Sequence, residues 1–444
     1  MPFFSNLVGD HTLVVAIILF AVAYIGMLAF AKARAYIALG AAALFALLGI
    51  LPWRELPGAV DWNVLMMIAG TMGTVTLFIE SKMPAKMADW LIDKSPNMKW
   101  AVIWLSVFAG VISAFVDNVA TVLMVAPVAV DIAKKQKISP VPAIIAIAIA
   151  SNLQGAATLV GDTTSILLAG EANMNFMDFF FFKPPGAARW GIGLFWIVQV
   201  AFVAATAILF IVFRKDKQPI HLQERTVVKD YLPTVLLLST ILGLILVSFL
   251  PDSLHLPREI NGIVCVGIFL IGVIFYALRR NTGIIKTAFK EMDYITLLLL
   301  AGLFIVIRGI GEAGVIEKIG EGFKAISSGN VFVLYTIIVW FSVFISALVD
   351  NIPFVATMLP VVTFLAEKMG APAYVLYFGL LSGATLGGNL TPIGASANIA
   401  ALGILRKEGH IVKSWTFMKL SIPYDIVAVI VGYVLVWVCW STIG

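Results

Sequence analysis

Residues 113–126 read SAFVDNVATVLMVA, and residues 346–359 read SALVDNIPFVATML. Each stretch carries an Asp-Asn pair in the middle of a run that is otherwise almost entirely apolar. A carboxylate in such a run costs several kcal/mol unless it is paired, neutralised or turned toward a water-filled cavity. Because the pair occurs at matching places in the two halves of the chain, the sequence predicts a functional site built from two related elements.

The composition indicates that the chain lies in a membrane. Of its 444 residues, 61% are hydrophobic and 12% are charged, and the mean hydropathy is +1.01. So few charges cannot cover the surface of a soluble protein of this length. Neither the two cysteines nor the four histidines have the spacing of a metal or catalytic centre. We expect an all-α polytopic membrane protein without a cofactor, whose partners are the lipid bilayer and a small inorganic ion or oxyanion, with no nucleic acid.

Eight apolar windows are long enough to cross a bilayer as single helices. They fall at residues 12–30, 34–52, 63–80, 190–213, 230–250, 257–278, 293–311 and 420–442. Four further apolar regions are interrupted. Residues 98–133 and 331–368 hold an Asp-Asn pair between two arms that are too short to cross singly, so we expect re-entrant helical hairpins. Residues 141–170 and 371–405 contain Gly- and Thr-rich patches, so we expect one broken helix in each.

Basic residues predict which loops share a side of the membrane, because cytoplasmic loops are rich in Lys and Arg. Six loops hold 22 of the 30 Lys and Arg residues. These loops are at residues 31–35, 81–100, 134–140, 214–229, 279–290 and 406–419. We therefore expect them to be cytoplasmic, with the protein in the cell (inner) membrane and both termini on the extracytoplasmic side.

Each half of the chain then has five crossings and one hairpin. Because five is odd, the second half runs upside down relative to the first. We expect a first inverted repeat at residues 1–213 with a hairpin that enters from the cytoplasm, a cytoplasmic linker at 214–229, and a second repeat at 230–444 with a hairpin that enters from outside. Inverted repeats with broken helices are typical of secondary transporters, which bind their substrate where the repeats meet.

The hairpin tips and the helix breaks supply oxygen ligands for a cation. At each tip one half-helix leaves carbonyl groups unpaired and the next leaves amide groups unpaired. The tips predict a site for Na+ or H+ at Asp117, Asn118, Asp350 and Asn351. The breaks add further candidate ligands, which are Thr158, Gly161, Asp162, Thr163 and Ser165 in the first half, and Thr391, Gly394, Ser396 and Asn398 in the second.

Structural roles are the alternative for these residues. Asp and Asn are good N-caps, and a hairpin between two half-helices needs a cap. Asp162 is a candidate cap at a break in the same way. The Gly- and Thr-rich patches alternatively allow close helix packing. Arg308, near the end of its span, is better explained as an interfacial anchor than as a ligand.

The segments SAFVDNVATVLMVAPV and SALVDNIPFVATMLPV, with GAATLVGD downstream of the first, resemble the ArsB/NhaD permeases of the ion transporter superfamily. That group also includes the melanosomal P protein. In the related divalent-anion:sodium symporters, the same positions carry Ser-Asn-Thr and bind sodium and a substrate carboxylate. Here Asp117 and Asp350 replace the Ser, and Val119 and Ile352 replace the Thr. The resemblance implies a scaffold that often forms a homodimer, and a transport domain that moves by elevator-type alternating access.

Three functions remain open. The first is a secondary active Na+/H+ antiporter, favoured by two motif Asp residues with no intramembrane Lys or Arg beside them. The second is efflux of arsenite or another oxyanion, or carboxylate symport, as the resemblance implies. The third is an ion channel, although two discrete broken-helix sites suit a carrier better. We expect no enzyme, because the sequence holds no nucleotide-binding loop, no HExxH motif and no Ser/His pair within one span.

Overall fold

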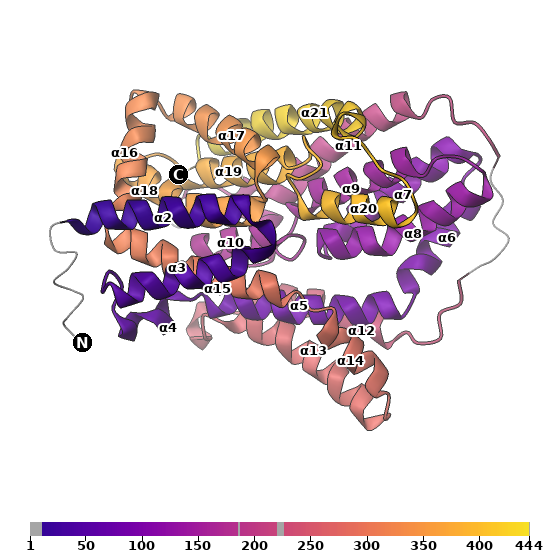
Figure 1. The fold of residues 1–444 in the computed structure, drawn as a ribbon, viewed down its shortest axis with the longest axis horizontal. Coiled ribbons are helices and arrows are strands. Elements are labelled where there is room, and N and C mark those ends of the chain that lie inside the picture. The colour runs from indigo at the N-terminus through magenta and orange to yellow at the C-terminus, as the bar shows by residue number, and fades with distance from the viewer. Residues whose placement is uncertain (1–10, 185–186, 220–225, 444) are drawn as a thin grey trace.

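The computed structural model describes residues 11–184, 187–219 and 226–443. Within these residues the chain is almost entirely helical, and most helices run along the long axis of the molecule (Figure 1). A short antiparallel pair, β1 (Phe181–Phe182) and β2 (Gly191–Ile192), is the exception. Eight helices are long and apolar enough to cross a membrane. The prediction of an all-α polytopic membrane protein is therefore confirmed.

The described helices of the first half cover every predicted apolar region and add two that were not predicted, α4 and α6. In order, the helices of this half are α2 (Thr12–Ala29), α3 (Arg34–Leu47), α4 (Leu56–Ala59), α5 (Trp62–Glu80), α6 (Met83–Asp93), α7 (Met98–Ser113), α8 (Asn118–Lys135), α9 (Val141–Gly155), α10 (Thr163–Ala172) and α11 (Leu194–Val212). The second half repeats this order. Its helices are α12 (Leu232–Ser248), α13 (Ile260–Leu278), α14 (Thr282–Lys290), α15 (Tyr294–Glu312), α16 (Val315–Ser327), α17 (Val331–Leu348), α18 (Asn351–Met369), α19 (Ala373–Gly387), α20 (Ser396–Lys407) and α21 (Ser414–Trp440).

The two halves begin their helices at matching positions. α7, α8 and α10 start at residues 98, 118 and 163, and α17, α18 and α20 start 233 residues later, at 331, 351 and 396. Matching side chains cap the helices by accepting hydrogen bonds from free backbone N–H groups. Asn97 and Asn330 cap α7 and α17, and Asp61 and Asp293 cap α5 and α15. The same local chemistry therefore builds both halves.

Each Asp-Asn pair lies at a sharp break between two helices. The first break separates α7 from α8, and the second separates α17 from α18. Figure 1 shows α7 and α8 on the right of the molecule and α17 and α18 on the left, with both breaks directed toward the middle. Both broken helices are also present, because residues 156–162 separate α9 from α10 and residues 388–395 separate α19 from α20.

The arms of the second hairpin are longer than expected. α17 has 18 residues and α18 has 19, and both are long and apolar enough to cross a membrane. At about 1.5 Å per residue each spans roughly 28 Å, close to the ~30 Å of a bilayer core. The prediction of two short arms was wrong here because only Val349 and Asp350 interrupt the apolar run. Conversely, α3 has 14 residues and ends early because Gly49 (φ 73°) and Pro52 follow it.

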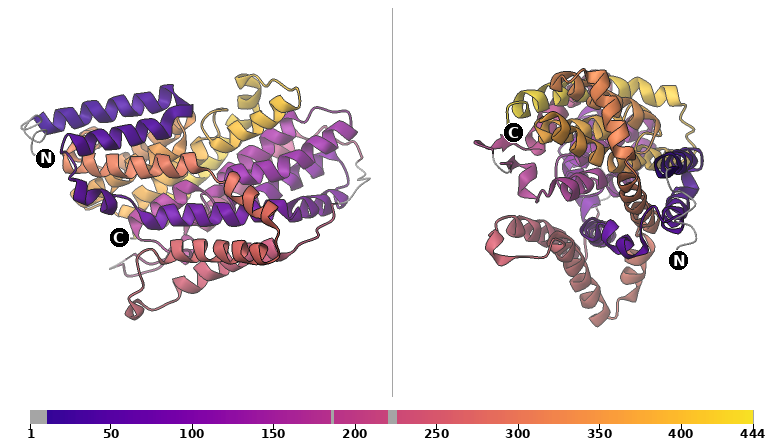
Figure 2. Two further views of the ribbon diagram at one scale, coloured as in Figure 1. Left: turned by 60° about the horizontal axis from the view of Figure 1, so that its bottom comes forward. Right: turned by 90° about the vertical axis from the view of Figure 1, so that its left-hand side faces the viewer.

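Several basic loops gather at one end of the molecule. Lys134 in the last turn of α8 forms an ion pair with Glu408 after α20, and the backbone N–H of Met98 donates to the carbonyl of Gln218 in the linker at 2.9 Å. Residues 220–225 of that linker lie outside the described residues. α2 begins and α21 ends at the opposite end (Figures 1 and 2). Residues 1–10 and 444 are not described, and the sidedness of both ends stays a prediction.

Candidate ion-binding site

Both motif aspartates are helix caps, as one of the alternatives proposed. The Asp117 Oδ1 atom accepts hydrogen bonds from the N–H groups of Val119 and Ala120 at 3.0 and 3.1 Å. The Asp350 Oδ1 atom accepts from the N–H of Ile352 at 3.1 Å. Capping uses one carboxylate oxygen in each case, and a neutral Ser or Thr would serve as well. The two sites differ in what surrounds the second oxygen of each carboxylate.

Asp350 forms an ion pair with Arg34, a residue that was expected in the cytoplasmic loop at residues 31–35. The Arg34 Nη1 atom lies 2.6 Å from Asp350 Oδ2, and the Ser396 hydroxyl donates to the same oxygen at 3.0 Å. The expectation of no basic residue beside the motif aspartates was therefore wrong. Arg34 reaches Asp350 because the turn of the short α2–α3 hairpin, at residues 30–33, lies partway along the molecule rather than at its end (Figures 1 and 2).

Asp162 lies where the two halves of the chain meet. Its Oδ2 atom accepts a hydrogen bond from the Thr164 hydroxyl at 2.9 Å and from the Asn351 amide, on the tip of the other half, at 3.3 Å. It precedes α10 without capping that helix through its side chain, so the capping alternative does not apply. Asp117, at the tip of the first hairpin, lines the same cavity as Asp162. The structure thus brings both hairpin tips to one buried carboxylate.

Asn118 turns away from Asp117 into a buried network of amides. Its Oδ1 accepts from the Ser113 hydroxyl at 2.8 Å, and its Nδ2 donates to Asn152 Oδ1 at 3.2 Å. Asn152 in turn donates to Asn389 Oδ1 at 3.1 Å, across the interface between the two halves. This network fixes the first tip against both broken helices.

Backbone carbonyls converge on the two glycines of the breaks. A Cβ atom on Gly161 would lie 2.6 Å from the carbonyl oxygen of Gly155 and 2.8 Å from that of Ser113. A Cβ atom on Gly394 would lie 2.5 Å from the carbonyl oxygen of Ser346. Helix ends leave such carbonyls unpaired, and discontinuous helices in transporters coordinate Na+ through them. These carbonyl oxygens are hard ligands of the kind that such transporter sites use.

The remaining predicted residues support these carbonyl-rich breaks. The hydroxyls of Thr158 and Thr391 donate to the carbonyls of Ala114 and Ala347, which are equivalent positions in the two halves. Two others bond the end of the preceding helix: Ser165 donates to the Gly155 carbonyl at 3.3 Å and Asn398 to the Gly388 carbonyl at 3.2 Å. These contacts hold the breaks in shape.

A cavity of about 280 Å³ leads to this site from the end of α5. Five carboxylates line it: Asp162 is buried, Asp117 is half-buried, and the outer three are exposed. The lining residues include Glu80, Asp117, Asn118, Asn152, Asp162, Thr163, Glu291, Asp293, Asn351 and Ser396. No Lys, Arg or His is among the described residues that line it. Asp350 does not border the cavity, and Arg34 neutralises it outside.

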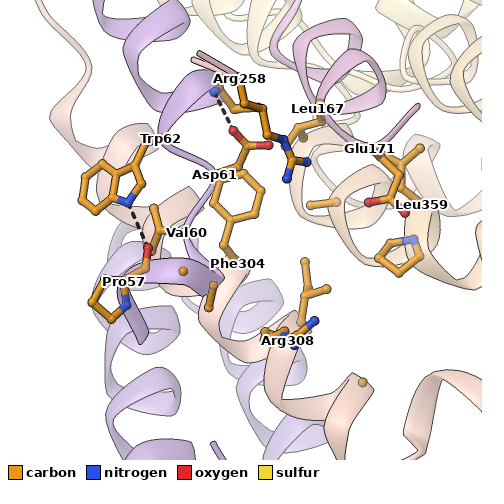
Figure 3. Close-up of a pocket in the computed structure, with 18 of the residues that line it drawn as sticks. Pro57, Val60, Asp61, Trp62, Leu167, Glu171, Arg258, Phe304, Arg308 and Leu359 are labelled. Atoms are coloured by element: carbon orange, nitrogen blue, oxygen red, sulfur yellow. Dashed lines mark hydrogen bonds between the residues drawn. The ribbon is translucent and has the colours of Figure 1, made fainter. Parts of the chain in front are cut away.

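A second cavity of about 500 Å³ lies at the other end of α5 (Figure 3). Asp61, the cap of α5, borders it as Asp293, the cap of α15, borders the first cavity. Figure 3 shows Arg258 pointing toward Asp61, with Glu171 across the cavity. The Trp62 indole donates to the Pro57 carbonyl at 2.9 Å and closes one wall. This cavity has both signs of charge and does not reach the hairpin tips.

Sequence reasoning missed three parts of the site. Asn152 and Asn389 lie within the predicted broken helices, where their amides inside apolar runs were a usable signal. Asp293 is a charged residue directly before an apolar window, which is a cap signature. Arg34 had no signal, because only the three-dimensional position of the α2–α3 turn brings it to Asp350.

Paired hairpins that bring their tips to a buried carboxylate, beside two broken helices, define a multi-pass membrane transporter. The chain belongs to the citrate transporter family, which matches residues 13–379. It is thus a secondary transporter of the ion transporter superfamily and not an enzyme, and the predicted resemblance is confirmed.

Relatives and a solved structure agree with this assignment. An uncharacterized transporter of Mycobacterium tuberculosis is 28% identical over 393 residues, which is 87% of this chain and 88% of the relative. The human P protein is 26% identical over 458 residues, covering 87% of this chain and 54% of that protein. The YdaH transporter of Alcanivorax borkumensis, at 15% identity, has a similar fold with a TM-score of 0.60 over 86% of this chain and 87% of that one.

Proposed function

We propose that this chain is a secondary active antiporter that exchanges a small cation such as Na+ for protons. One observation carries this proposal: the cavity that reaches the hairpin tips is bordered by five carboxylates and by no basic residue among those described. A cleft lined by one sign of charge concentrates ions of the other sign. The carbonyl oxygens at Gly161 supply ligands without adding further charge.

The exchange follows from competition for Asp117 and Asp162. A cation between these carboxylates favours their ionised forms, and its binding therefore releases protons. Loss of the cation reverses the step, because two unpaired carboxylates in a buried site repel each other. Asp350 takes a different role from the one first predicted. Arg34 neutralises it, so it holds the second tip and Ser396 in place.

Two cavities at opposite ends of α5 support alternating access. We infer that the first opens to the cytoplasm, because it lies at the end that carries the basic loops, and that the second belongs to the outward path. The matching helix starts of the two halves support inverted repeats at 1–213 and 230–444. An elevator-type movement of the hairpins and broken helices against a dimeric scaffold would open the two paths in turn.

A carboxylate is the second candidate substrate, because the family is named for citrate transport. A free tricarboxylate would face five carboxylates in the cavity. The guanidinium beside the site, that of Arg34, is already paired with Asp350. We therefore propose that any carboxylate substrate enters only together with a cation that offsets its charge.

Transport by the full-length protein in proteoliposomes that hold a pH-sensitive dye tests the proposal. Pulses of Na+, Li+, citrate, arsenite and, as a control, choline are added outside. We expect Na+ or Li+ to drive protons out of the vesicles and choline to have no effect. Proton movement driven by citrate or arsenite alone, with none driven by Na+ or Li+, would overturn the antiporter proposal.

A further inference from the structure

Asp425 is a carboxylate that the proposed exchange does not use. It lies in the middle of α21, in the stretch SIPYDIVAVIVG, and its side chain is fully buried. Neither carboxylate oxygen has a hydrogen-bond partner among the described residues. An ionised carboxylate in that state costs several kcal/mol, and removing the charge by protonation avoids the cost.

The surroundings of Asp425 offer no counter-charge. α21 packs against α9, α11 and α19. α9 and α11 contain no titratable residue, and the titratable residues of α19 are Tyr374 and Tyr377, close to its far end. On α21 itself, Lys419 is exposed at the surface, six residues before Asp425. The other titratable residues of α21 are the adjacent Tyr424 and, further along the helix, Tyr433 and Cys439.

Between the equivalent helices of the first half, α9 and α11, the buried polar contact is a neutral, satisfied pair. Gln199 on α11 faces Gln154 near the end of α9, and the two amides exchange hydrogen bonds of 2.9 and 2.8 Å. In the second half α21 takes the place of α11, and the Ser421 hydroxyl, one turn before Asp425, donates at 3.4 Å to the carbonyl of Leu390, the residue next to Asn389 just beyond the end of α19. A position that needed only a buried polar contact would be served by such an amide pair. The carboxylate is therefore the feature that requires an explanation.

Asn389 joins Asp425 to the ion cavity. Its Oδ1 atom accepts from Asn152, which lines the cavity, and its Nδ2 atom donates to the Ile149 carbonyl at 3.1 Å. A protonated Asp425 has an O–H to donate, whereas an ionised Asp425 can only accept. Gain or loss of the proton at Asp425 therefore changes whether the oxygen or the NH2 group of the Asn389 side chain is preferred beside it. A rotation of the Asn389 amide in turn requires Asn152 to change its hydrogen bond.

We propose that Asp425 is a proton-binding site, separate from the cation cavity and coupled to it through Asn389 and Asn152. The carboxyl group gives its proton to solvent water when the amides turn their N–H groups toward it. It takes a proton back when they return to the arrangement seen here. The coupling to transport rests on the proposed antiport, but proton binding at Asp425 does not.

Thermal unfolding of the purified full-length protein tests proton binding without any substrate. On this proposal the folded protein binds a proton that the unfolded chain releases, so stability falls as the pH rises. At pH values above the ordinary titration range of a carboxyl, we expect the melting temperature of wild type to fall more steeply with pH than that of Asp425→Asn, with about one proton fewer linked to unfolding of the variant. The comparison is made in an Asp178→Asn background, so that 'wild type' here means wild type at residue 425. This background removes another titrating carboxyl.

Tyr424→Phe is the matched control, because it removes a neighbouring buried hydroxyl and leaves the carboxyl. Its pH profile is expected to follow wild type. Equal slopes for wild type and Asp425→Asn would overturn the proposal. If Asp425→Asn does not fold, the infrared band of a protonated carboxylic acid is compared in wild type and Asp425→Glu. A band that shifts in Asp425→Glu supports the proposal, and an unshifted or missing band contradicts it.

Exchange assays test the coupling. In proteoliposomes, Asp425→Asn is expected to retain exchange of labelled for unlabelled Na+. Proton flux driven by Na+ is expected to fall at least about tenfold, which corresponds to a loss of about 1.4 kcal/mol of coupling free energy. Proton flux equal to wild type would mean that the Asp425 proton is not the coupled one. Failure of both exchanges in wild type would contradict the antiporter proposal and leave the unfolding result standing.

Discussion

At the residue scale, the Arg34–Asp350 pair explains how one motif carboxylate differs from the other. The pair is mostly buried, with side-chain exposures of 20% and 11%, and its atoms lie 2.6 Å apart. Breaking such a pair leaves an uncompensated charge, whereas removing both charges is often tolerated. Asp117 has no such partner among the residues that the structure describes, and it faces the cavity instead. Equivalent sequence positions thus have different chemistry.

We predict that Arg34→Gln lowers the free energy of unfolding by about 3 kcal/mol, because it leaves Asp350 unpaired. Adding Asp350→Asn should restore most of the loss, because the amide still caps α18 and carries no charge. Unfolding of the two single variants and the double variant in detergent gives the coupling energy. Additive losses would mean that the two charges do not interact.

A second prediction concerns Asp178, in the segment between α10 and α11. Burial raises the pKa of this carboxyl to about 6, although the N–H of Asn175 donates to it. A raised pKa in the folded state adds stability at low pH that is lost as the pH rises through about 6. Asp178→Asn should therefore remove a decrease in melting temperature between acidic and neutral pH. An unchanged pH profile would contradict this.

At the element scale, the two breaks depend on glycines that approach carbonyl oxygens. Much of this was predictable: the bounds of α7, α8, α10 and their counterparts follow from the Asp-Asn pairs and the Gly-rich patches. Contacts between distant elements were not. Arg34 reaches Asp350 only because the α2–α3 turn lies partway along the molecule. Asp425 lay within an apolar window that was treated as an ordinary span. The rule that singled out Asp117 applies equally to Asp425, so that omission was avoidable.

We predict that Gly161→Ala disables transport, because its Cβ would lie 2.6 Å from the Gly155 carbonyl oxygen and displace the ligands at the first break. The matched control is Gly403→Ala in α20, where nothing lies within 4 Å of the added Cβ. Alanine is the better helix former by about 1 kcal/mol, so the control should be unchanged or more stable. Equal transport in both variants would show that the close approach has no role.

At the scale of the whole molecule, the two cavities lie at opposite ends of α5 and are bordered by matching helix-capping aspartates, Asp61 and Asp293. Of these two cavities, the one beside Asp293 reaches the hairpin tips, and the lining of the other includes no tip residue among those described. One path is therefore connected to the site and the other is not, as alternating access requires of a single state. The basic loops beside the connected path suggest that this state faces the cytoplasm.

Sidedness is tested by cysteine labelling in intact cells, in a background without Cys265 and Cys439. We predict that Lys217→Cys, in the linker, resists an impermeant reagent added from outside, because it lies at the end with the basic loops. Arg258→Cys, beside the second cavity, should react. The reverse pattern would invert the topology and assign the acidic cavity to the outside.

The most direct test of a proton-coupled cation site is calorimetric titration of Na+ or Li+ into the purified full-length protein. Repeating it in two buffers with different heats of ionisation gives the number of protons released per cation. The account predicts release of about one proton or more, lost together with high-affinity binding in Asp162→Asn, where the amide keeps the Thr164 contact and loses the charge. Cation binding without proton release, or equal binding by Asp162→Asn, would contradict it.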